Sequence, residues 1–176
     1  MRGFFLFNTK PAYLYNQPTA MASKNKNTFV VSIIISWLIA GTLDGLAAIF
    51  ILAHGQAAKV FRYVASAVYG KEAFLGGASM IWTGVAFHYS IAAAFTVFFF
   101  VLYSYVPLLR KNTLLVSLIY GVFAWAVMNM LVLPLTQVVY TITFAGAVKN
   151  ILILCVCIAL PVVIIRHRYE QLEKPL

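Results

Sequence analysis

An aspartate inside a long apolar run is the residue of this sequence best suited to chemistry. Asp44 lies between Gly41 and Gly45 in the run 28–53, which is otherwise almost wholly apolar and long enough to cross a bilayer. A carboxylate in hydrocarbon costs about 2.5 to 3.5 kcal/mol on insertion scales, so such a group is paired inside a bundle or lies beside water. Asp44 is therefore a candidate functional residue.

Three further polar side chains lie in other apolar runs: His88, Asn129 and Asn150. If each run crosses the membrane once, all these groups and Asp44 fall in the half of the bundle nearer one face. A histidine beside Asp44 would satisfy the carboxylate or relay protons, and the amides would orient water or a ligand. The sequence leaves open a structural polar cluster, a site for protons, ions or a polar ligand, and groups that never meet.

The same residues argue against metal, cofactor and enzyme chemistry. One imidazole, one carboxylate and two amides make a poor ligand set, so we predict no metal and no cofactor. No nucleophile lies beside a base with an orienting third group, so we predict a protein that is not an enzyme. Cys155 and Cys157 would point about 200° apart on a helix and are predicted to be free thiols.

The composition indicates an integral membrane protein. Hydrophobic residues make up 63% and charged residues 10% of the chain, whereas about a quarter of a soluble domain is charged. The formal charge of +9 could suggest nucleic acid, but the basic residues lie at the ends of apolar runs and form no patch. We therefore predict the lipid bilayer as the environment and no nucleic-acid partner.

The pattern predicts an all-α, polytopic membrane protein with a four-helix transmembrane domain. The domain covers 28–166, with spans at about 28–53, 78–105, 113–133 and 148–165. Flanking it we predict an irregular cytoplasmic N-terminal tail, 1–27, in which Met1 and Met21 are both plausible starts, and a cytoplasmic C-terminal tail, 167–176.

The stretch 54–75 between the first two spans keeps a helical apolar period but is too short and too charged to cross. It predicts an amphipathic connector helix on the outer surface, ended by Gly76 and Gly77. Such a helix could lie in the headgroups or cover a polar site. Small residues that permit close helix packing are expected at Gly41, Gly45, Gly84 and Gly121.

Basic residues predict the orientation, because cytoplasmic loops of membrane proteins collect Lys and Arg. With the N-terminus inside, the inner segments hold Arg2, Lys10, Lys24, Lys26, Arg110, Lys111, Arg166, Arg168 and Lys174. The outer segments then hold only Lys59, Arg62, Lys71 and Lys149. We predict both termini in the cytoplasm, and His54 and His167 solvated at opposite interfaces.

The segment 84–135 resembles the YagU-like group, poorly characterised four-span proteins of the bacterial inner membrane. The resemblance rests on Gly84–His88 (GVAFH), the turn at Tyr105 to Pro107, Gly121, and the motif MNMLVLPL at Met128–Leu135. It implies a small bacterial inner-membrane protein with no established activity. Members of the group often carry a histidine after a glycine in the last helix, where this sequence has Asn150.

Small size and short loops favour an accessory, assembly or interaction subunit, with a membrane-protein partner or a homo-oligomer. A bulky aromatic face, Phe95, Phe98, Phe99, Phe100 and Tyr103, is expected to contact lipid or that partner. The alternative is a small transporter or proton- or ion-conducting protein that uses Asp44 and His88. Since four short helices enclose little volume, we expect a single chain to hold a proton path more readily than a solute cavity.

Overall fold

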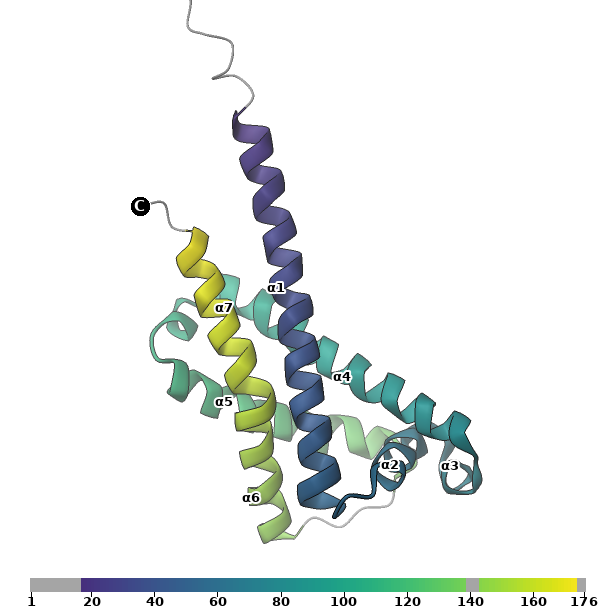
Figure 1. The fold of residues 1–176 in the computed structure, drawn as a ribbon. Coiled ribbons are helices and arrows are strands. Elements are labelled where there is room, and N and C mark those ends of the chain that lie inside the picture. The colour runs from purple at the N-terminus through teal and green to yellow at the C-terminus, as the bar shows by residue number, and fades with distance from the viewer. Residues whose placement is uncertain (1–16, 139–142, 174–176) are drawn as a thin grey trace, which may run out of the picture.

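The computed structural model describes residues 17–138 and 143–173, and the secondary structure in these ranges is entirely helical (Figure 1). Four helices are long and apolar enough to cross a membrane: Asn27–Leu52, Ala78–Tyr105, Thr113–Leu135 and Phe144–Leu172. The predicted all-α polytopic fold is confirmed. The chain is a multi-pass helical membrane protein.

Each span is built from one or more helical elements. The first comprises α1 (Gln17–Ala47) and η2 (Ala48–Leu52), and the second is α4 (Ala78–Tyr105). A short η3 (Pro107–Arg110) leads to the third span, which comprises α5 (Thr113–Ala126), η4 (Val127–Val132) and η5 (Leu133–Leu135). The fourth comprises α6 (Phe144–Ile153), η6 (Leu154–Ala159) and α7 (Leu160–Glu173), which runs beside α1 (Figure 1).

Both ends of the described chain are more helical than the sequence predicted. Residues 17–27 were expected to be irregular, but α1 already begins at Gln17. Pro18 falls in the first turn, where its missing N–H has no helical partner to lose, and Ala20 to Ala22 are good helix formers. At the other end α7 continues through the expected tail as far as Glu173.

A dense apolar core occupies the half of the bundle where α4 ends, α5 begins and α7 lies. Its buried members include Phe99, Phe100, Tyr103, Val162 and Val163. The predicted aromatic lipid or partner face is therefore wrong: Phe95, Phe99, Phe100 and Tyr103 are buried, and only Phe98 of that set is exposed. These rings pack between helices beside the small core residues Ala40 of α1, Ala124 of α5 and Ala159 of η6.

The opposite half of the bundle is opened by irregular helix. Two spans change from α to π geometry there, in η2 and η4, and the fourth span does so near its middle, in η6. A π turn inserts an extra residue per turn and is found frequently at functional sites. This half contains the span ends at Leu52, Ala78, Leu135 and Phe144, and these are called the loop ends below.

The connector between the first two spans lies against this open half. It forms α2 (Ala57–Tyr69) and α3 (Glu72–Leu75), separated by Gly70 at φ 55°. The Gln137 backbone N–H and side-chain amide donate to the carbonyls of Ala67 and Val68, at 3.1 and 2.7 Å. Hydrogen bonds therefore tie the end of α2 to the end of the third span.

Candidate functional site: a cavity beneath α2

A cavity of about 1010 Å³ lies between the spans and α2. All four polar residues singled out from the sequence line it: Asp44, His88, Asn129 and Asn150. Each comes from a different span, and we call these four residues the polar belt. The structure brings together the groups that could have pointed apart.

His88 is held by the backbone of the first span. Its Nε2 lies 2.8 Å from the Gly41 carbonyl oxygen, and since a carbonyl can only accept, Nε2 carries the hydrogen. The ring fits because residue 45 is glycine: a Cβ there would lie 3.2 Å from Nε2. In the neutral ring Nδ1 remains a base, while the hydrogen bond fixes the tautomer.

Asp44 is half-buried near His88. The imidazole is hydrogen-bonded to the helix backbone rather than to the carboxylate. The carboxylate is thus placed on the cavity wall with a partly compensating neighbour. A carboxylate in this position can accept hydrogen bonds from a bound molecule or from water.

The two asparagines complete the belt from the third and fourth spans. Asn129 lies within η4 and donates through Nδ2 to the Trp125 carbonyl, at 2.9 Å. Asn150 lies in α6 and is half-buried on the cavity wall. Amides supply both donors and acceptors, so the belt can satisfy more than one kind of polar group.

Above and below the belt the lining changes character. Towards the loop ends, the rim carries His54, Lys59 and Lys149, which are exposed. Further along the spans, the floor is apolar and includes Phe95 and Ile158. The cavity lining therefore combines exposed basic residues near the loop ends, the polar belt and a buried apolar floor.

The predicted packing glycines hold these walls together. Gly41 faces Tyr89 and Ala92 of α4, at 3.0 and 3.3 Å from a built Cβ. A Cβ on Gly84 would lie 1.8 Å from the Phe61 carbonyl oxygen of α2, and one on Gly121 would lie 2.7 Å from the Cys155 Cα. The glycines therefore pack α1 on α4, α2 on α4, and α5 on η6 within one chain.

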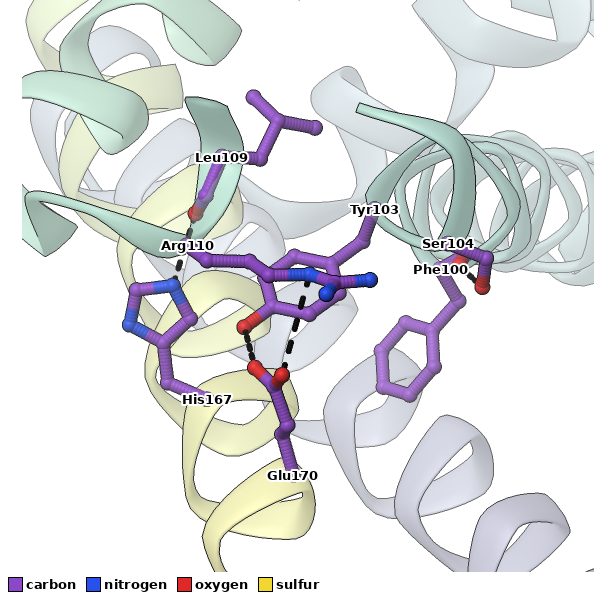
Figure 2. A network of polar contacts seen from close by, with 7 residues as sticks. All are labelled: Phe100, Tyr103, Ser104, Leu109, Arg110, His167 and Glu170. Carbon is purple, nitrogen blue, oxygen red and sulfur yellow. Dashed lines mark hydrogen bonds and ion pairs between the residues drawn. The ribbon is translucent and has the colours of Figure 1, made fainter. Parts of the chain in front are cut away.

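A second polar network lies at the other end of the bundle (Figure 2). The Tyr103 hydroxyl donates to the Glu170 carboxylate, and the Arg110 Nε lies 3.8 Å from Oε1 of the same carboxylate. His167 Nε2 donates to the Leu109 carbonyl at 2.8 Å. The prediction of a solvated His167 is wrong, because its ring bonds to the loop between the second and third spans.

Arg166 of α7 is buried in an aromatic cage next to this network. Its guanidinium carbon lies 4.3 Å from the ring centre of Tyr103, 5.2 Å from Tyr169, 5.7 Å from Phe100 and 5.9 Å from Phe29. Its Nε and Nη1 are buried without a hydrogen-bond partner. Cation–π contacts thus surround a charge that has incomplete hydrogen bonding.

Sequence reasoning missed this cage and network, and it also missed the basic rim. Arg110, Arg166 and Lys149 were interpreted only as topology signals, and Glu170 was not considered. The available signal was the spacing of Arg166, His167 and Glu170, which places them on one face of a helix that extends beyond the apolar core.

No protein-family model matches the chain, and neither a curated protein nor a solved structure shows significant similarity to it. The resemblance to the YagU-like group therefore stays a prediction.

Proposed function

We propose that this chain is a non-enzymatic inner-membrane protein that binds a small amphiphilic molecule in the cavity beneath α2. The apolar body of the molecule lies on the floor, and its polar end points towards the belt and the rim. The observation that carries the proposal is the convergence of Asp44, His88, Asn129 and Asn150 on one cavity of about 1010 Å³.

The size and lining of the cavity support this function. Ligand sites are typically concave, about 300 to 1,000 Å³ in volume, and mostly apolar with a few placed polar groups. This cavity is at the upper end of that range and its floor is apolar. A carboxylate inside the membrane is energetically costly and therefore marks a candidate functional site. Here Asp44 lines the cavity.

The geometry bears on both functions predicted from the sequence. We expected a single chain to hold a proton path more readily than a solute cavity, but a cavity of about 1010 Å³ lies within this one chain, so a small transporter stays the alternative. The hypothesis of an accessory subunit loses one of its supports, because four of the five aromatic residues proposed as a partner face are buried, and it keeps its supports of small size and short loops. A partner and a homo-oligomer remain predictions, as do the bacterial inner membrane and cytoplasmic termini.

Filling the cavity tests the proposal. Ala147 lines the cavity, whereas Ala145 of the same helix is exposed and does not line it. We expect Ala147→Trp to abolish binding of radiolabelled dodecanol, measured by scintillation proximity on protein in lipid nanodiscs. Ala145→Trp adds the same bulk outside the cavity and should bind like the wild type. Equal binding by the wild type and both variants, or no saturable binding to the wild type, would refute the proposed function.

A further inference from the structure

The rim of the cavity carries a chemical preference that the belt alone does not specify. We propose that the bound molecule is a single-chain amphiphile with an anionic head, and that Lys59 and Lys149 bind this head at the rim. This inference rests on the proposed function and adds the class of ligand to it.

The two lysines reach the cavity from different elements. Lys59 lies in the first turn of α2 and Lys149 lies in α6, and both line the cavity. The one ion pair found in the described part of the chain joins Arg110 to Glu170, at the other end of the bundle. Neither rim lysine is therefore neutralised by a carboxylate of the described residues, and both charges are available to an anion.

The charge pattern along the cavity fixes the direction of the ligand. An anionic head is favoured away from Asp44, because an ionised carboxylate there would repel it. At the rim, two cations attract it, and His54 lines the cavity beside them. The apolar body then passes the belt and ends at the floor, so the head points towards the loop end of the bundle.

The length of the cavity suits an acyl chain of medium length. Lys149 and Ile158 lie on the same continuous helix, and at 1.5 Å per residue they are separated by about 13 Å along its axis. An acyl chain of medium length covers that distance. A single-chain carboxylate of this length can place its head at the lysines and its chain on the floor.

The experiment compares three probes with the same apolar body: dodecanoate, dodecanol and dodecylammonium. Binding is measured by scintillation proximity on protein in nanodiscs of neutral lipid, with wild type and the double variant Lys59→Gln/Lys149→Gln. Two partly exposed ion pairs should make dodecanoate bind about tenfold tighter than dodecanol. The double variant should lose this preference while it keeps its affinity for dodecanol, and raised salt should reduce the preference in the wild type.

The control is Lys71→Gln, because Lys71 is exposed in the α2–α3 turn and does not line the cavity. Dodecanoate preference that persists in the Lys59→Gln/Lys149→Gln variant, or a preference of the wild type for dodecanol or dodecylammonium, overturns the anionic class and leaves cavity binding intact. Saturable binding of none of the three probes refutes the proposed function itself. Competition by a diacyl phosphatidylglycerol but not by dodecanoate would overturn the single-chain assignment.

Discussion

The contact between α2 and α4 at Gly84 gives the sharpest prediction for the architecture of the cavity. A Cβ at this position would lie 1.8 Å from the carbonyl oxygen and 2.5 Å from the carbonyl carbon of Phe61. These are backbone atoms, so no side-chain rotation relieves the clash. To reach an ordinary contact of 3.4 Å from 1.8 Å, the helices must separate locally by about 1.6 Å.

We therefore expect Gly84→Ala to destabilise the protein although alanine is the better helix former. Overpacking costs about 1 to 3 kcal/mol, and a rigid backbone neighbour places the cost at the upper end. The gain in helix propensity returns about 1 kcal/mol. The net loss of about 2 kcal/mol corresponds to a decrease in Tm of about 4 to 8 °C for a chain of this size.

The assay is thermal unfolding in detergent, followed by hydrogen exchange across α2. Ala86→Val is the matched control, because Ala86 is exposed on the same helix, and its Tm should stay near that of the wild type. In Gly84→Ala the amides of α2 should exchange faster than in the wild type. A Tm of Gly84→Ala equal to or above that of the wild type, with unchanged exchange in α2, would refute this packing.

Two predictions concern the other end of the bundle and one concerns the belt. Arg166→Met should keep or raise the Tm, because it removes a buried charge with two unpaired donors. Arg166→Ala should cost about 2 to 5 kcal/mol of stability through lost packing. Equal losses of stability in the two variants would show that the charge itself stabilises the cage. Tyr103→Phe should lower the free energy of unfolding, measured with denaturant, by about 1.5 to 3 kcal/mol, because it removes a hydroxyl bonded to a carboxylate. This loss should be smaller in a Glu170→Gln background, and the same loss in both backgrounds would contradict the contact. Asp44→Leu should weaken dodecanol binding while raising or preserving the Tm, and a large decrease in Tm would indicate that Asp44 serves structure instead.

The four spans could be predicted from the sequence because each is an apolar run with breakers or charges at its ends. Pro107 and the basic residues after it end the second span, and the structure places the end of α4 at Tyr105. The depth of Asp44 and His88 in their spans also follows from counting residues. These features depend on local sequence, so they can be recognised from a single amino-acid sequence.

The cavity could not be predicted, because it depends on how the helices diverge. The π segments η4 and η6 carry no evident local signal, since Val, Leu, Ile and Cys also fill ordinary spans. The burial of Phe99 and Phe100 depends on small residues in other helices, not on their own neighbours in the sequence. Which side of an apolar helix faces lipid is therefore decided by tertiary packing.

Ligand protection of the belt tests the central claim most directly. In a background with Cys155→Ala and Cys157→Ala, Asn150→Cys places a thiol on the cavity wall and Leu152→Cys places one on the exposed face of the same helix. A water-soluble thiosulfonate should label position 150 much faster than position 152, and saturating dodecanoate should slow labelling at position 150 at least several-fold. Equal labelling at both positions, or labelling of position 150 that dodecanoate, dodecanol and dodecylammonium all leave unchanged, would contradict a ligand-binding cavity.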